Sequence, residues 1–296
     1  MYLHNNYPVA AIRESVLGSL QTEQVLHAAE LISHADGLII AAGAGMGIDS
    51  GLPDLGDNHG LWHAYPALEQ LGLGFSDVAS PQMFRNDPHL AWGFYGHRLG
   101  LYRQTRPHAG HAILQRWSQA APQGSFVYTS NIDEQFQRAG FAAERIHECH
   151  GSLQWLQCLQ PCCNAVWPAT TLVPRVNVAK CHWRDPLPHC PHCGGLARPN
   201  VLMFRDGDWQ DERYDRQFDR MAEWLRQVRR PVVIEIGAGT EIATVRHLSE
   251  HLVQQFNARL VRINPNDESV SREADVGLAA GALAALQAID HLINGV

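Results

Sequence analysis

The sequence predicts an α/β protein with a Rossmann-like parallel sheet and helices on both faces. Short apolar runs, typical of strands buried on both sides, recur along the 296-residue chain and alternate with segments of helical periodicity. Polar or glycine-rich segments follow these runs, as expected where a ligand binds at the carboxyl ends of parallel strands. Two clusters of cysteines interrupt this alternation and predict a small zinc-binding insertion.

The first predicted elements are a helix that begins at Thr22 and a buried strand over residues 38–42. Threonine is a good helix-capping residue, and the apolar positions of this helix share one face: Val25, Ala28, Ala29 and Ile32. The strand is apolar without alternation, which indicates burial on both of its faces. Residues 1–21 show neither pattern and are predicted to form an N-terminal arm.

A helical module is predicted over residues 61–107, inserted before the second strand. Asp87-Pro88 predicts a helix start, because proline is favoured at the first helical position. The module is rich in aromatic residues, and we interpret these as core packing: Trp92, Phe94 and Tyr95.

Four further strands are predicted over residues 125–130, 145–149, 232–236 and 259–263, with helices over 242–256 and 282–293. Their carboxyl ends lead into "NID" at 131–133, His150-Gly151, "GAGT" at 237–240 and Asn264-Pro265. Together with the glycines of 43–51, these segments should meet at one edge of the sheet. We predict that residues 22–153 and 200–296 form the main domain and that residues 154–199 form a zinc-ribbon domain.

Two cysteine pairs about 27 residues apart suit a tetrahedral structural Zn²⁺ without an open coordination position. The second pair is a C-x-x-C knuckle followed by two glycines, whereas the first pair has two possible partners for Cys158. Cys162 is favoured over Cys163 because it gives the tighter knuckle, although the spacing admits either residue. The expected ligands are Cys158, Cys162, Cys190 and Cys193. We interpret Cys149 and Cys181 as small buried residues.

Composition excludes several classes of protein. A formal net charge of −7 argues against direct nucleic-acid binding. No stretch approaches the roughly 20 apolar residues of a membrane-spanning helix, and the N-terminus lacks the pattern of a signal peptide. Seven clustered cysteines fit a metal site in a reducing compartment better than a disulfide framework. We expect a cytoplasmic protein without a membrane partner.

The order of the short motifs resembles the sirtuin family. These motifs are "GAGMGIDSGLPDL", "GLW", "SNID", "CHGSL", the paired cysteines, "GAGT" and "IN", and they extend over about residues 22–290. The resemblance implies a Rossmann-like domain with a zinc ribbon and the activity of an NAD-dependent protein lysine deacylase. Such an enzyme consumes NAD, transfers the acyl group to ADP-ribose and releases nicotinamide. The implied partner is an acyl-lysine protein or peptide.

The resemblance also implies roles for individual residues. His150 and Asn131 correspond to catalytic residues, with the His150 imidazole as the base that activates a ribose hydroxyl. Val201 and Phe204 of "VLMF" correspond to a strand-like segment that binds the substrate, although a plain buried strand fits this run equally well. The implied NAD-binding residues are Gly43, Ala44, Gly45, Pro53, Asp54, Ser130, Asn131, Ile132, Asp133, Gly237, Ala238, Gly239, Thr240 and Asn264.

Departures from the family pattern lie at the reacting end of NAD. Gly47 replaces a serine, Leu55 a phenylalanine and Gly56 an arginine, and the aromatic residue normally shields the reactive ribose carbon from water. We therefore hypothesise slow or redirected cofactor turnover. The alternatives are an NAD glycohydrolase or ADP-ribosyltransferase, and a non-catalytic NAD or ADP-ribose sensor.

Two further departures and one loose similarity concern the substrate. Ser130 stands where the family has a glutamine, and Arg205-Asp206 stands where "GE" is usual. Tyr102, Arg103 and Arg106 resemble the tyrosine and arginine placement that selects succinyl or malonyl groups in some sirtuins. A solvated helix face is the alternative interpretation of the two arginines.

Overall fold

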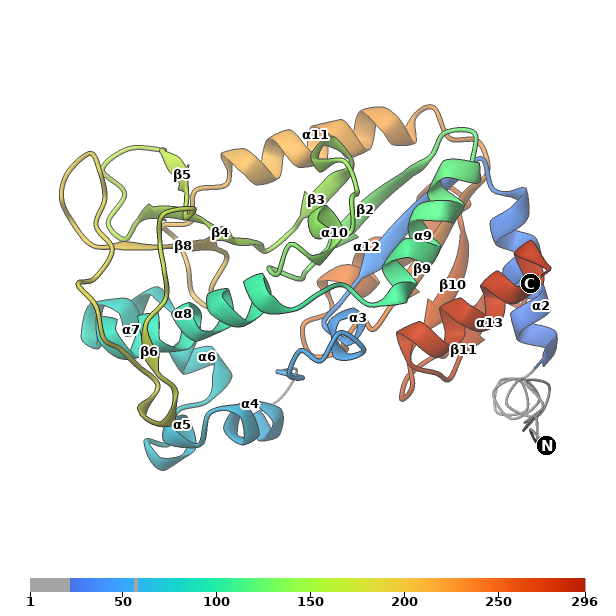
Figure 1. The fold of residues 1–296 in the computed structure, drawn as a ribbon. Helices are drawn as coiled ribbons and strands as arrows, with labels where there is room; N and C mark the ends of the chain where they lie inside the picture. The colour runs from blue at the N-terminus through green and yellow to red at the C-terminus, as the bar shows by residue number, and fades with distance from the viewer. Residues whose placement is uncertain (1–21, 56–57, 296) are drawn as a thin grey trace, which may run out of the picture.

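A computed structural model describes residues 22–55 and 58–295. Its larger part is built on a six-stranded parallel sheet with the strand order β11-β10-β9-β1-β2-β3 (Figure 1). The strands are β1 (Gly37–Ala42), β2 (Ser125–Thr129), β3 (Ile146–Glu148), β9 (Pro231–Ile236), β10 (Arg259–Ile263) and β11 (Val276–Leu278). The predicted Rossmann-like sheet is thus confirmed, and β11 is added to the five predicted strands. The predicted N-terminal arm and Gly56 lie outside the described residues.

Helices cover both faces of this sheet because its strands are apolar on both faces. Within β1, Leu38, Ile40 and Ala42 belong to one core, whereas Ile39 and Ala41 belong to the core on the opposite face. The first core is covered by α2 (Thr22–His34), α9 (Ala109–Ala120) and α13 (Ala282–Asn294), and the second by α11 (Glu212–Leu225) and α12 (Thr244–Gln255). The predicted apolar face of α2 is buried as expected.

The predicted helical module precedes α9. After the short α3 (Gly45–Ile48) it comprises α4 (Asn58–Ala64), α5 (Pro66–Gln70), α6 (Phe75–Val78), α7 (Pro81–Asn86) and α8 (Pro88–Gln104). The Asp87 carboxylate accepts a hydrogen bond from the Leu90 backbone N–H at 2.9 Å and caps α8, which confirms the predicted helix start. Trp92, Phe94 and Tyr95 are buried, so their interpretation as core residues is also confirmed.

A smaller part lies at the opposite end of the molecule from α13 (Figure 1). It contains the antiparallel sheet β5-β4-β8, formed by β4 (Gly151–Cys158), β5 (Val166–Pro168) and β8 (Ala197–Val201), and the pair β6 (Val176–Asn177) and β7 (His182–Trp183). The sheet begins directly after His150. The division of the chain at 153/154 and 199/200 remains a prediction.

The small part and the helical module share one hydrophobic core. Leu153 and Leu156 of β4 belong to the same buried cluster as Trp92 and Phe94 of α8. This shared core fixes the small sheet against α8. Within the described ranges, none of the helices combines the length and apolar character needed to cross a bilayer.

Candidate functional site

A cavity of about 660 Å³ opens at the carboxyl ends of β1 and β2, between the parallel sheet, the helical module and the loop after β8. Most of the residues implied by the sequence line it: Ala44, Pro53, Asp54, Ser130, Asn131, Ile132, Asp133, His150, Val201, Phe204, Gly239 and Thr240. The remaining ones are not among the lining residues: Gly43, Gly45, Gly237, Ala238 and Asn264. Segments far apart in sequence therefore meet at one site, as the strand order requires.

Three of the implied glycines pack against each other at the ends of β1 and β9. A Cβ atom at Gly43 would lie 2.5 Å from the Gly237 carbonyl oxygen, and one at Gly45 would lie 2.6 Å from the Gly237 Cα. The Gly45 N–H donates a hydrogen bond to the Gly237 carbonyl at 3.0 Å, and Gly237 has a φ of +58°. Only glycine fits such a close approach of two backbones. The loops after β1 and β9 are thereby joined, which presents Ala44 and Gly239 to the cavity.

Asn131 and Asp133 follow β2 and are held by local hydrogen bonds. The Asn131 side-chain amide donates to the Gly43 carbonyl at 2.9 Å, so this residue links the "NID" segment to the glycine loop. An Asp133 carboxylate oxygen accepts a hydrogen bond from the Gln135 N–H at 2.9 Å. Asp133 is only 6% exposed, and this burial raises its carboxyl pKa to about 6.

His150 lies between β3 and β4 and projects into the cavity. Its Nε2 is 3.2 Å from the Thr244 Oγ1, and its carbonyl accepts a hydrogen bond from the Leu202 N–H at 3.0 Å. Burial lowers the pKa of the imidazole, so the ring is neutral near pH 7 and can accept a proton. Gly151 has a φ of +76°, and a Cβ there would lie 2.1 Å from the Asn200 carbonyl oxygen, so glycine is required for β4 to begin at this point.

The segment "VLMF" is a strand only as far as Val201. Beyond it the chain forms a loop, because the Met203 N–H bonds to the Asp206 carboxylate at 3.2 Å and the Phe204 N–H bonds to the Ala79 carbonyl at 2.9 Å. Neither N–H is therefore available to a neighbouring strand. The alternative of a plain buried strand therefore holds only as far as Val201, whereas Val201 and Phe204 both line the cavity.

A buried ion pair holds this loop in place. The Arg198 guanidinium donates to the Asp206 carboxylate at 2.7 Å, and neither side chain is exposed. Arg198 also donates to the Val201 carbonyl at 3.2 Å. The family pattern has a glutamate where Asp206 stands, so an acidic side chain is kept at this position, and it fixes the loop. Arg205, the residue before it, adopts a left-handed φ of +56°.

Arg98 is a cavity residue that the sequence analysis missed. It projects from α8, is 8% exposed, and donates through Nε and Nη2 to the Tyr102 hydroxyl at 2.9 and 2.7 Å. Its guanidinium carbon lies 5.1 Å from the centre of the Phe94 ring. Among residues 22–55 and 58–295, no carboxylate forms an ion pair with it. The charge of Arg98 acts on Asp133, whose pKa it lowers against the larger opposing effect of burial.

The interpretation of Arg103 and Arg106 as acyl-selecting residues is wrong, because neither lines the cavity. Arg103 donates to the Gln154 side chain at 2.8 and 3.0 Å and to the Ala169 carbonyl at 2.8 Å, so it ties α8 to the small part. Arg106 is exposed. Arg98 and Tyr102 face the cavity together because side chains four residues apart share one face of a helix.

Leu55 also lines the cavity and is 8% exposed. It occupies the wall where the family pattern leads us to expect a phenylalanine. A leucine side chain covers less surface than an aromatic ring, so this part of the wall offers less shielding from water.

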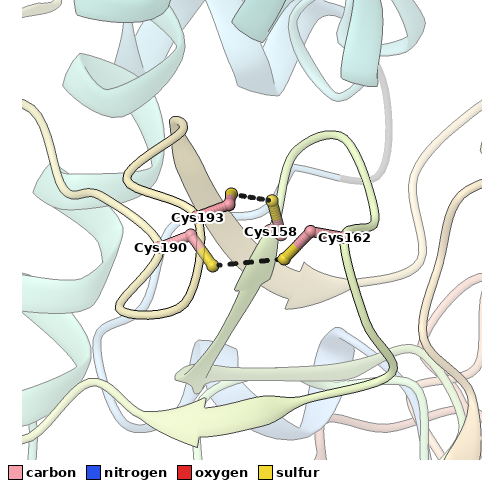
Figure 2. Close-up of side chains that lie close together, drawn as sticks. All are labelled: Cys158, Cys162, Cys190 and Cys193. Atoms are coloured by element: carbon pink, nitrogen blue, oxygen red, sulfur yellow. Dashed lines mark hydrogen bonds between the residues drawn. The ribbon is translucent and has the colours of Figure 1, made fainter.

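The four expected zinc ligands gather in the small part (Figure 2). Their Sγ atoms all lie within 4.8 Å of one another, at 3.6 Å for Cys158–Cys193 and 3.7 Å for Cys162–Cys190. Such separations fit a tetrahedral Zn²⁺ with Zn–S distances of about 2.3 Å. The cluster includes Cys162 and not Cys163, in line with the tighter knuckle, and none of its members lines the cavity, as expected for a structural metal.

Comparisons with known proteins agree with this architecture. The sequence model of the Sir2 family matches residues 43–243. The NAD-dependent protein deacylase of Corynebacterium glutamicum is 30% identical over 269 residues, covering 90% of this chain and 95% of that protein. The one from Aquifex aeolicus is 26% identical over 256 residues, covering 86% and 95%. A Sir2 homologue solved in complex with NAD superposes with a TM-score of 0.68 at 22% identity, covering 90% of this chain and 93% of that one.

An open parallel sheet with a polar cavity at the carboxyl ends of its strands, joined to a four-cysteine site, defines a Rossmann-type protein with a structural zinc module. The chain belongs to the Sir2 family.

Proposed function

We propose that this protein is an NAD-dependent protein lysine deacylase that transfers the acyl group to ADP-ribose and releases nicotinamide. The observation that carries this proposal is the convergence of His150, Asn131 and the loop at Val201–Phe204 in one cavity. The relatives described above carry the name of NAD-dependent protein deacylases, which supports the same activity.

The residues of the cavity fit NAD. Backbone groups of Ala44 and Gly239 border the cavity at the joined loops, as expected for a pyrophosphate site. Asn131 and Asp133 offer polar groups for the nicotinamide ribose and the carboxamide. NAD, when bound, would supply the ribose whose reactive carbon loses nicotinamide and whose hydroxyl receives the acyl group. The neutral imidazole of His150 would accept the proton of a ribose hydroxyl.

Arg98 indicates the class of acyl group. Its buried guanidinium uses two donors on the Tyr102 hydroxyl, and the side chain offers five N–H donors in all. An acyl chain that ends in a carboxylate, such as malonyl or succinyl, would pair directly with the guanidinium and form charge-assisted hydrogen bonds. We therefore propose that acidic acyl-lysines are preferred over acetyl-lysine.

The test is mass spectrometry of the products formed from NAD and acetyl-, malonyl- or succinyl-lysine peptides. The wild-type protein should deacylate the acidic peptides at least about tenfold more efficiently, and His150→Ala should abolish deacylation. Arg98→Met should lose the acidic preference, whereas the exposed matched control Arg106→Met should keep it. Equal rates on all three peptides would leave the deacylase assignment intact and refute the role of Arg98.

Leu55 favours a second candidate activity, NAD hydrolysis or ADP-ribosyl transfer, because it leaves the cavity wall less shielded. Incubation with NAD alone separates the activities, since a strict deacylase releases little nicotinamide without an acyl-peptide. Leu55→Phe should then reduce any nicotinamide release that does not require peptide. A non-catalytic sensor would instead retain its biological function in His150→Ala.

We also propose that the protein acts in the cytoplasm and without direct contact to nucleic acid. Reduced thiols at the four-cysteine site support the first proposal, and the net charge of −7 supports the second. Cell fractionation and a binding assay with duplex DNA at low salt test them.

A further inference from the structure

Thr244 is the first residue of α12 and lines the same cavity as His150. Its hydroxyl oxygen lies 3.2 Å from Nε2 of His150. Within the part of the chain that the structure describes, this is the only hydrogen bond recorded for the imidazole ring. The other residues at this end of the cavity are Gly239, Thr240, Glu241 and Ile242, and none of them contacts the ring through a recorded hydrogen bond.

The threonine hydroxyl is not used to stabilise its own helix. At a helix start, Ser and Thr hydroxyls usually accept hydrogen bonds from free backbone N–H groups. The residue that caps α12 is Ala243, which has no such side chain, and the Thr244 hydroxyl is directed to the histidine instead. Branching at Cβ restricts its side-chain rotamers, so the hydroxyl is held in this direction.

A hydroxyl suits both protonation states of an imidazole, because it can donate one hydrogen bond and accept another. It donates to Nε2 when this nitrogen carries no proton, and it accepts from the Nε2–H when the ring is charged. The second bond is charge-assisted and is the stronger of the two. A hydroxyl at this position therefore favours the imidazolium that forms when His150 takes up a proton.

We propose that Thr244 is a positioning residue for His150, which holds the ring toward the cavity and stabilises its protonated form during the reaction. This proposal rests on the proposed function of His150 as the base. The first residue of α12 thereby supports the reaction together with His150, which follows β3. The closely packed glycines after β1 and β9 hold the loop that leads to this helix.

Charged side chains around His150 do not determine its pKa. The ionisable side chains that line the cavity with His150 are Asp54, Tyr95, Arg98, Tyr102, Asp133 and Glu241. The shift of the His150 pKa is nevertheless caused by burial, which lowers it, and no charged neighbour contributes. Removing the hydroxyl should therefore lower the pKa of His150 further, because the charged form loses its partner.

The experiment compares Thr244→Val, which removes the hydroxyl at constant shape, with Thr244→Ser, which retains it. Gln254→Val, an exposed position on the same helix, is the matched control. The first readout is the ring-nitrogen NMR titration of the ligand-free protein, with the His150 signal assigned from His150→Ala. The second is the pH profile of kcat and kcat/KM for deacylation.

We expect Thr244→Val to lower the pKa of His150 by about half a unit or more and to reduce kcat about tenfold with little change in KM for NAD. Thr244→Ser and the control should resemble the wild type. An unchanged titration in Thr244→Val, or an equal loss in Thr244→Ser, would overturn the proposal. The NMR readout does not depend on turnover, so a wild-type protein without deacylase activity would refute the proposed function and leave the contact testable.

Discussion

Substituting the buried acid Asp133 by asparagine should stabilise the protein while impairing it. The carboxyl is 6% exposed, and burial raises its pKa from 3.8 to about 6. A shift of about two pKa units corresponds to about 3 kcal/mol, since each unit is worth about 1.4 kcal/mol. The amide oxygen of asparagine can still accept the hydrogen bond from the Gln135 N–H, so the local turn is retained.

The sign of the effect follows from proton linkage. Between pH 4 and pH 6 the folded protein holds a proton on Asp133 that the unfolded chain releases. The free energy of unfolding therefore falls as pH rises through this window, and the full cost is present above pH 6. Asp133→Asn should exceed the wild-type stability by up to about 3 kcal/mol at pH 8, and the two proteins should be equal near pH 4.

Urea denaturation followed by tryptophan fluorescence at pH 8, 6 and 4 measures this difference directly. Groups that do not interact with Asp133 titrate alike in both proteins, so their contributions cancel from the comparison. Activity should fall, because the proposed contact of the carboxylate with the nicotinamide amide is lost. A gain in stability at the expense of activity is common at functional sites. A stability difference that is independent of pH, or a less stable variant at pH 8, would refute the reasoning.

Three further outcomes are expected. Cys158→Ser should release zinc. Cys162→Ser should still bind zinc, but more weakly, because the Cys163 Sγ lies 3.6 Å from that of Cys162 and can replace it. Elemental analysis of the purified proteins measures the zinc content of both variants. Asp206→Asn should lower the free energy of unfolding by about 3–5 kcal/mol, since it leaves a buried guanidinium unpaired, and urea denaturation checks this. Deacylation should decline as pH falls through the lowered pKa of His150, at a pH below its ordinary 6.5, and a pH–rate profile locates the midpoint.

Each of these outcomes has a contrary result. Complete loss of zinc from Cys162→Ser would show that Cys163 cannot replace its neighbour. An Asp206→Asn variant as stable as the wild type would mean that the loop rests on other contacts. A rate midpoint above 6.5 would indicate that His150 is not the titrating base.

Much of the fold could be predicted because local pattern and tertiary environment agree. The apolar face of α2, the all-apolar β1 and the capped start of α8 each carry their own signal, and all three are confirmed. The strand β11 was missed because three residues, one of them a glycine, form no recognisable run. In "VLMF" the apolar pattern favoured a strand, but the Asp206 carboxylate takes the backbone N–H that a strand would need.

The missed part of the site depends on contacts that no local pattern encodes. Arg98 lies in a helix whose aromatic residues were correctly interpreted as core, and a charged residue in a helix usually marks its solvated face. Its burial beside Tyr102 is a property of the folded module. The role of Thr244 likewise depends on its contact with His150, which is 94 residues away in the sequence. The histidine could be found because a short motif surrounds it, and its partner has no such motif.

The chain enters and leaves the zinc-bearing part at one place. It departs through His150 and Gly151 and returns through Val201 and Leu202, and these two segments are paired, with the Leu202 N–H bonded to the His150 carbonyl. His150 therefore lies at the junction of the two sheets, and its backbone is held by the same segment that leads on to Phe204. The zinc-bearing part is also packed on α8, so a displacement of this part relative to the parallel sheet would carry α8 with it.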